Sequence, residues 1–149
     1  YTTSMVPEFF PGLPEILADF KKAGGKVVVV SHSEEDLIKR DYSLKAKING
    51  TQFFPDMIFG WTYDDEKRKP SPWPVFTALE KLGIEPKDSV ILDDLKPGVL
   101  MGRNTNVDVI AAGWGYNVPE IRNYMEKNCV NYCETVSSFR QLLLGDYYR

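Results

Sequence analysis

The stretch VILDDLKPG, residues 90–98, decides how this chain folds. Its first three residues, Val90 to Leu92, predict a strand that is apolar on both faces, as in a parallel sheet covered by helices. Asp93 and Asp94 follow directly, where ligands bind in open α/β sheets. Two adjacent acids repel each other, so they either hold a cation or lie solvated at the strand end. On this pair alone, the solvated strand end is the simpler interpretation.

Strand-like and helix-like segments alternate along the rest of the chain. Strands are expected at Val27 to Val30, Met57 to Phe59, Val90 to Leu92, Val107 to Ala111 and Cys129 to Tyr132. Helices are expected at Leu13 to Ala23, after the N-cap Ser33, from Ser71-Pro72 to Gly83, at about Gly98 to Arg103, Glu120 to Lys127 and Ser138 to Leu144. Residues 63–68 are polar and predict a loop. This alternation predicts an α/β protein with a Rossmann-like, three-layer parallel sheet.

Composition limits the class of protein. The 149 residues suffice for one domain with a core, and 43% hydrophobic with 26% charged residues is ordinary for a globular protein. A net charge of −3 gives no sign of a nucleic-acid partner, and no apolar run approaches a membrane span. Cys129 and Cys133 could form a disulfide or a metal pair, but with one His a zinc site lacks ligands. Reduced thiols in a cytoplasmic protein are the favoured interpretation.

Three predicted strand ends and loops carry polar groups that suit a metal-assisted phosphate site. Ser31 follows the first strand, Lys69 precedes a helix, and the acid pair follows residues 90–92. The Ser31 hydroxyl and the backbone N–H of His32 could hold phosphate oxygens at a helix start. Lys69 could neutralise phosphate, and Asp93 with Asp94 could hold Mg²⁺. Taken singly, Ser31 would be a turn serine, Lys69 a surface lysine and His32 an exposed loop residue.

In this order, the motifs resemble those of the haloacid dehalogenase-like hydrolases, closest to the phosphoglycolate phosphatase and β-phosphoglucomutase type. The resemblance rests on FPG (10–12), VVVVS (27–31), KPSP (69–72), LEKLGIEP (79–86), ILDD (91–94) and GWGY (113–116). It implies that residues 1–10 are the exit linker of a cap domain absent from this chain. Residues 11–149 would then form an incomplete core domain.

The resemblance also implies the role of each candidate residue. Ser31 and Lys69 would be catalytic, and Ser31, Lys69 and the His32 N–H would bind phosphate. Asp94 would be the direct Mg²⁺ ligand, and Asp93 a second ligand or an acid behind it. The implied activity is a Mg²⁺-dependent phosphatase that acts on a small phosphorylated metabolite through an aspartyl-phosphate.

The first motif of that family, a DxD that supplies the nucleophilic Asp, does not occur in this sequence. Asp64-Asp65, Asp19 and Asp56 do not end a predicted strand and are not substitutes. The fragment alone is therefore expected to be inactive. The resemblance places the lost first strand centrally, between the strands that end at Ser31 and Asp94, so its loss would expose two strand edges.

That strand could come from an N-terminal part of the protein that this chain lacks, or from a swapped second copy. Residues 2–6 are the least favoured source, because they offer few apolar residues. A non-catalytic module of the same family, binding phosphate or a protein partner, is the alternative function. A receiver domain is disfavoured because its acids come first and its lysine last. The substrate stays open, as does the choice between phosphatase, mutase and dehalogenase.

Overall fold

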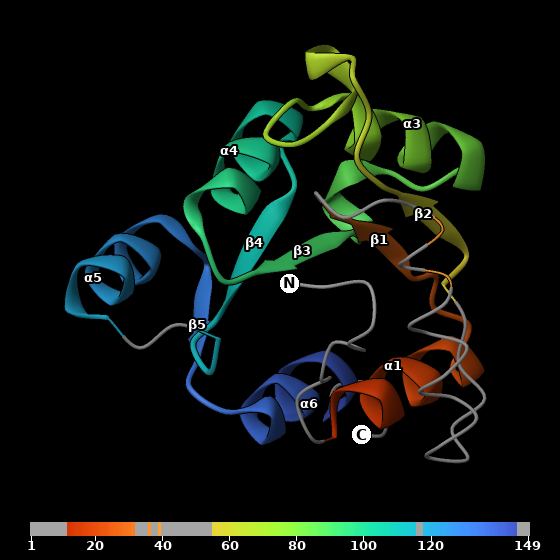
Figure 1. The fold of residues 1–149 in the computed structure, drawn as a ribbon. Helices are drawn as coiled ribbons and strands as arrows, with labels where there is room; N and C mark the ends of the chain where they lie inside the picture. The colour runs from red at the N-terminus through yellow and green to blue at the C-terminus, as the bar shows by residue number, and fades with distance from the viewer. Residues whose placement is uncertain (1–11, 32–35, 37–38, 40–54, 116–117, 146–149) are drawn as a thin grey trace. The chain divides into compact units, whose positions relative to one another are not determined.

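The computed structural model describes residues 12–31, 36, 39, 55–115 and 118–145 (Figure 1). In chain order its elements are α1 (Leu13–Lys22), β1 (Val28–Val30), β2 (Met57–Phe59), the 3-10 helix η1 (Asp65–Lys67), α3 (Trp73–Leu82), the 3-10 helix η2 (Pro86–Asp88), β3 (Val90–Asp93), α4 (Lys96–Thr105), β4 (Asp108–Ala112), α5 (Pro119–Asn128), β5 (Asn131–Cys133) and α6 (Val136–Leu144). All described strand pairs are parallel, which confirms the predicted α/β class. None of the helices in the described ranges could cross a membrane.

The chain divides into two compact units, which are described separately below. The N-terminal unit comprises Tyr1–Trp61 with Arg140–Arg149, and the central unit comprises Thr62–Phe139. The strands divide in the same way, because β1 and β2 form a two-stranded sheet whereas β3, β4 and β5 form a three-stranded one. Among the described residues, β1 therefore pairs only with β2 and β3 only with β4.

The N-terminal unit contains a short parallel pair held at its start by one acid. Val28 to Val30 pair in register with Met57 to Phe59. A carboxylate oxygen of Asp56 accepts a hydrogen bond from Val27 N at 2.7 Å, and its other oxygen lies 3.3 Å from Lys21 Nζ at the end of α1. Asp56 therefore joins α1 to the first strand, a structural role that agrees with its rejection as a nucleophile.

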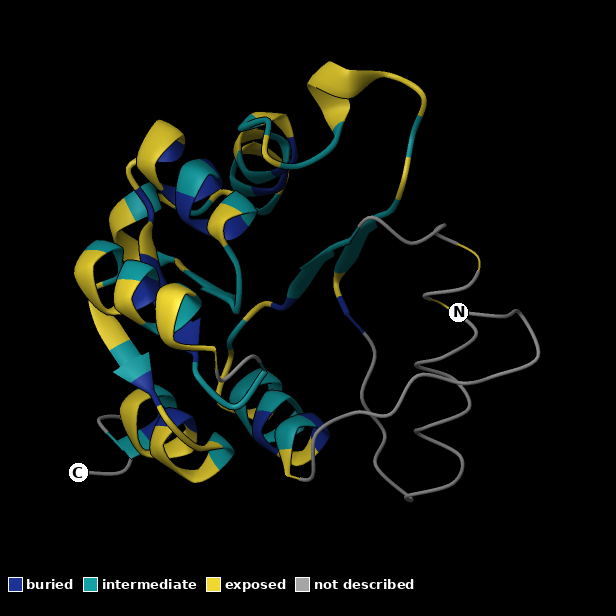
Figure 2. Cartoon of the chain, turned by 60° about the vertical axis from the view of Figure 1, so that its left-hand side comes forward, coloured by how far each residue is buried: buried dark blue, intermediate teal, exposed yellow. Residues whose placement is uncertain are grey.

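The central unit is built around β4, the middle strand of its sheet. Four of the five residues of β4 are buried, and the core cluster joins Val109 and Ala111 to Val99 of α4 and Met125 of α5. Figure 2 shows that the helices carry buried residues alongside exposed ones, the amphipathic pattern of helices that cover a sheet. This sheet presents the carboxyl end of β3, where the acid pair lies.

Several predicted boundaries were wrong by one or two residues. The helix expected to have Ser71 as its N-cap and Pro72 as its first residue begins one residue later, at Trp73, and Ser71 Oγ accepts a hydrogen bond from Trp73 N at 3.2 Å. The helix expected at Gly98 begins at Lys96 because Pro97 fits the first turn of a helix. The expected loop over residues 63–68 contains η1. The helix expected after Ser33 lies almost wholly outside the described residues.

The last strand was placed too early in the sequence. Cys129 caps α5, because its N–H donates to Met125 O at 3.0 Å, and the strand begins only at Asn131. Both cysteines are free thiols, and Cys133 is buried. Burial raises the pKa of each thiol above its ordinary value, so the thiol form is favoured in both.

Gly102 of α4 packs tightly against β4 and the residue before it. A Cβ atom at this position would lie 2.2 Å from Val109 Cγ2 and 2.7 Å from the backbone oxygen of Val107. Gly102→Ala is therefore expected to lower the free energy of unfolding by about 1–3 kcal/mol through overpacking. Urea unfolding of the variant and the wild type checks this, and an unchanged midpoint would contradict it.

Candidate functional site

The acid pair ends β3 and contacts the predicted lysine. Lys69 Nζ lies 3.1 Å from Asp93 Oδ2, across 24 positions of sequence. Both side chains are largely buried, at 18% and 10% exposure. Partial burial limits screening by solvent, so the ion pair is stronger than one on the surface. The structure thus brings together Lys69 and the acid pair, as the order of the motifs predicts.

Asp93 is held by further contacts from its own chain. Its Oδ1 accepts hydrogen bonds from Asp94 N at 2.7 Å and from Leu95 N at 3.2 Å. Gly98 of α4 packs against the same side chain, since a Cβ atom there would lie 2.3 Å from Asp93 Oδ2. Asp93 is therefore fixed by three donors, and it links the end of β3 to the start of α4.

Asp94 lies in a different electrostatic environment. Burial raises the pKa of its carboxyl above the ordinary value of 3.8, and the hydrogen bond and negative charge of Asp93 raise it further. The positive charge of Lys69 acts in the opposite direction and lowers this pKa. A carboxylate that is buried beside a second carboxylate gains more from a bound cation than a solvated one would.

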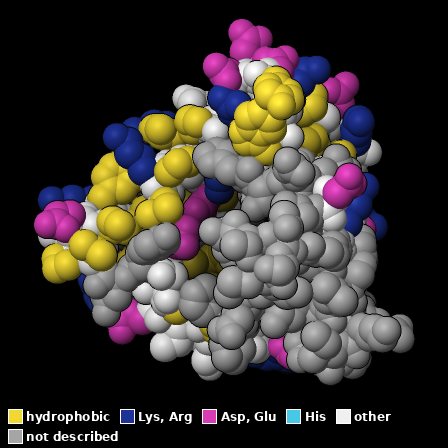
Figure 3. Space-filling view, viewed as in Figure 1, with side chains coloured by type: hydrophobic (Ala, Val, Ile, Leu, Met, Phe, Trp, Pro, Cys, Tyr) yellow, Lys and Arg dark blue, Asp and Glu magenta, His cyan; other side chains and the backbone are white. Residues whose placement is uncertain are grey.

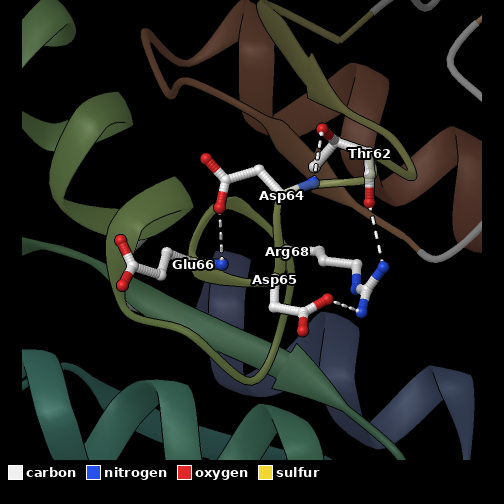
Figure 4. Close-up of polar contacts among 5 residues, drawn as sticks. All are labelled: Thr62, Asp64, Asp65, Glu66 and Arg68. Carbon is white, nitrogen blue, oxygen red and sulfur yellow. Dashed lines mark hydrogen bonds and ion pairs between the residues drawn. The ribbon is translucent and has the colours of Figure 1, made fainter.

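A polar network fixes the segment that carries Lys69 (Figure 4). Arg68 donates to Thr62 O at 3.0 Å and also pairs with Asp65, while Asp64 Oδ1 accepts from Glu66 N at 3.0 Å. On the other side of Lys69, the Ser71 hydroxyl donates to Glu66 O. The Lys69–Pro70 peptide bond is cis. The residues on both sides of Lys69 are therefore tied to the η1 turn, which limits where its ammonium can reach.

The same turn exposes several acidic side chains. Acidic side chains gather at the top of the space-filling view, over η1 (Figure 3). They include Asp64, Asp65 and Glu66, which are exposed. Their exposure and their local hydrogen bonds identify them as part of the turn.

Ser31 follows β1 directly, as predicted. Its N–H donates to Phe59 O at 2.9 Å, which extends the β1–β2 ladder by one residue. Ser31 belongs to the N-terminal unit, whereas Lys69 and the acid pair belong to the central unit. A common rim for these residues stays a prediction. His32, expected to offer its backbone N–H, lies outside the described residues.

The donor set at the end of β3 fits a hard cation with few protein ligands. No three His, Cys, Asp or Glu side chains gather into a metal site within the described ranges, so the acid pair offers two carboxylates. Mg²⁺ commonly uses one or two carboxylates and keeps several waters. Asp94 packs closely against Gly115, where a Cβ atom would lie 2.5 Å from Asp94 Oδ2, so a glycine is required beside this carboxylate. The residues present therefore fit Mg²⁺.

Two glycines at this site were not among the predicted site residues. Because neither glycine has a side chain, Gly98 can lie against Asp93 and Gly115 can lie against Asp94. From sequence alone, Gly98 is interpreted as part of a Pro-Gly turn, and Gly115 is only part of the GWGY stretch. A sequence signal was present in these motifs, but the contact partner of a glycine follows only from the three-dimensional structure.

Comparisons with known proteins agree on one family. The sequence profile of haloacid dehalogenase-like hydrolases matches residues 3–112. A phosphoglycolate phosphatase from Aquifex aeolicus is 33% identical over 107 residues, which is 72% of this chain and 48% of that protein. A pyrophosphatase PpaX from Bacillus velezensis is 31% identical over 101 residues, 67% of this chain and 44% of its own length. The chain thus spans about half the length of these relatives.

Solved structures show the same fold at low sequence identity. The D,D-heptose 1.7-bisphosphate phosphatase from B. bronchiseptica, complexed with magnesium and phosphate, aligns with a TM-score of 0.75 at 14% identity. That alignment covers 97% of this chain and 91% of the other. CbbY from Rhodobacter sphaeroides, in complex with phosphate, aligns with a TM-score of 0.65 at 20% identity, over 84% of this chain and 53% of the other.

Proposed function

Because this chain belongs to the haloacid dehalogenase-like hydrolase family, we propose that it forms the phosphate- and metal-binding part of a Mg²⁺-dependent phosphatase. The substrate would be a small phosphorylated metabolite. The observation that carries this proposal is the buried contact between Lys69 and Asp93 at 3.1 Å, with Asp94 next in sequence at the carboxyl end of β3. Free thiols at Cys129 and Cys133 are compatible with a reducing cytoplasm as its location.

The proposed roles follow from charge and position. Asp94 is the direct metal ligand, because its carboxyl is buried beside a second acid whose own charge Lys69 already balances. Asp93 pairs with Lys69 and orients the end of β3 at which the metal would bind. When bound, Mg²⁺ would offset the negative charge that develops on the phosphoryl oxygens. Lys69 offsets the same charge from the other side, and Ser31 with the His32 N–H orients the phosphoryl group.

The nucleophile in this proposal is an aspartate outside these 149 residues, since the sequence contains no DxD. Its carboxylate oxygen attacks phosphorus, the phosphorus–oxygen bond to the leaving group breaks, and water then cleaves the aspartyl-phosphate to release inorganic phosphate. A strand that carries this aspartate would pair with the second edge of β3, which has no partner among the described residues. A longer form of the protein would supply this strand and its aspartate.

The relatives indicate the chemical class of the substrate and not its identity. Their names describe a phosphoglycolate phosphatase and a pyrophosphatase, both of which act on small phosphorylated compounds. We propose the same class here. The alternative, a non-catalytic module that binds phosphate or a partner protein, is favoured by one observation: the 149 residues contain no candidate nucleophile at a strand end.

Hydrolysis of p-nitrophenyl phosphate distinguishes these two functions. We expect the complete protein, including its first-motif aspartate, to release p-nitrophenol with Mg²⁺ and to lose this activity in EDTA. The 149-residue chain by itself is expected to show none under either condition. Equal rates of the complete protein with Mg²⁺ and with EDTA would remove the main support for a metal-dependent phosphatase. Phosphate binding without turnover would favour the non-catalytic module.

A further inference from the structure

We propose that the Gly113–Gly115 turn after β4 is the wall that fixes the Asp94 carboxylate for metal binding, with Gly115 as a positioning residue. The inference rests on the proposed metal site. It adds Gly115, a residue that supplies no ligand atom. Gly115 acts only because it has no side chain that would displace Asp94.

The geometry at Gly115 is close on several atoms of Asp94 at once. A Cβ atom at Gly115 would lie 2.5 Å from Asp94 Oδ2, 2.8 Å from its Cβ and 3.1 Å from its Cγ. The Cβ of an aspartate is tethered directly to the backbone, here at the end of β3. Rotation of the carboxylate alone therefore cannot relieve the clash, and a side chain at position 115 must displace the whole Asp94 side chain or the turn.

The turn itself is held in place by four contacts. Gly113 N donates to Cys133 O at 2.8 Å, and Gly115 N donates to Ala112 O at 3.1 Å. The Trp114 ring lies 6.1 Å from the ring of Phe139, which is only 2% exposed. Behind Gly113 lies the Tyr132 ring, 2.5 Å from where a Cβ atom would be. Because these contacts hold the turn on β4 and β5, displacement is expected mainly at Asp94.

The two acids are thus positioned in different ways. Asp93 is fixed by hydrogen bonds from Lys69 and two backbone amides, so its place depends on donors. The side chain of Asp94 is instead packed against the backbone of Gly115. A methyl group at position 115 should therefore change metal affinity while leaving the Lys69–Asp93 contact intact.

Mn²⁺ titration of the complete protein, followed by paramagnetic broadening of amide NMR signals, measures this affinity directly. We expect Gly115→Ala to weaken Mn²⁺ binding at least about tenfold, the usual effect of disturbing a residue that orients a metal ligand. Gly102→Ala is the matched control: it adds the same methyl group at another tight glycine, lowers stability, and should leave Mn²⁺ affinity within about twofold. Asp94→Asn serves as the reference without the ligand.

The outcomes separate this inference from the proposed function. If the wild type binds Mn²⁺, Asp94→Asn does not, and Gly115→Ala binds like the wild type, Gly115 has no positioning role. If Asp94→Asn binds as well as the wild type, the proposed metal site is wrong and this inference falls with it. Should Gly115→Ala fail to fold, Trp114→Leu loosens the same turn without adding atoms beside Asp94. Severalfold weaker Mn²⁺ binding is then expected, and unchanged binding would overturn the proposal.

Discussion

Replacement of Lys69 with methionine is expected to lower the phosphatase turnover of the complete protein by about 10²- to 10³-fold, the usual cost of removing one preorganised group that stabilises developing charge. Methionine keeps much of the length of the side chain but removes the ammonium that lies 3.1 Å from Asp93. The acid pair would then lack its cation, and the pKa of Asp94 would rise further because Lys69 now lowers it. Steady-state hydrolysis of p-nitrophenyl phosphate measures the loss.

Lys67→Met is the matched control for this prediction. Lys67 lies two residues away, with its ammonium 5.3 Å from the centre of the Trp73 ring. It carries the same charge, so a general electrostatic effect would appear in both variants. We expect turnover within about twofold of the wild type for Lys67→Met. Similar losses in the two variants would contradict a specific role for Lys69.

Asp94→Asn is expected to abolish Mn²⁺ binding and to make the metal-free chain more stable at neutral pH. The pKa of Asp94 is raised in the folded state, so the folded state prefers the protonated carboxyl. Its contribution to stability is full below the ordinary value of 3.8 and is lost as the pH rises through the raised pKa. At neutral pH the ionised Asp94 therefore destabilises the metal-free fold, and a neutral amide removes that cost.

Urea unfolding at a series of pH values checks the sign of this effect. From acid toward neutral pH, the unfolding free energy of the wild type should lose a component that the Asp94→Asn variant does not lose. Addition of Mg²⁺ should stabilise the wild type and leave the variant unchanged, because only the wild type binds the ion. A variant that is less stable than the wild type at neutral pH, without metal, would show that Asp94 has a structural role instead.

The acid pair and its lysine could be predicted from sequence because their signals are local. Val90 to Leu92 form an apolar run that ends in two carboxylates, and the carboxyl end of a parallel strand is where ligands bind. The family resemblance then linked Lys69 to that strand end across 24 residues, and the structure has the contact. The α/β class followed from the alternation of apolar runs with amphipathic segments in the same way.

Other features depend on contacts that no local pattern contains. The role of Gly115 requires the backbone after β4 to approach Asp94, a residue 21 positions earlier. Cys129 and Tyr132 lie in a strand-like stretch, yet Cys129 still completes the last turn of α5, because Met125 O accepts its N–H. In each case a tertiary contact or a backbone hydrogen bond overrode the local signal.

The Arg140 guanidinium lies 2.7 Å from the Asp19 carboxylate, a pair separated by 121 positions, and the N-terminal unit is completed by residues after 139. During synthesis the ribosome delivers all of the central unit before it delivers Arg140. The central unit is continuous in sequence, so it is expected to fold first. Asp19 of α1 can pair with Arg140 only after the C-terminal end of the chain has been synthesised. Until then α1, β1 and β2 are the segments of the nascent chain that most need protection by a chaperone.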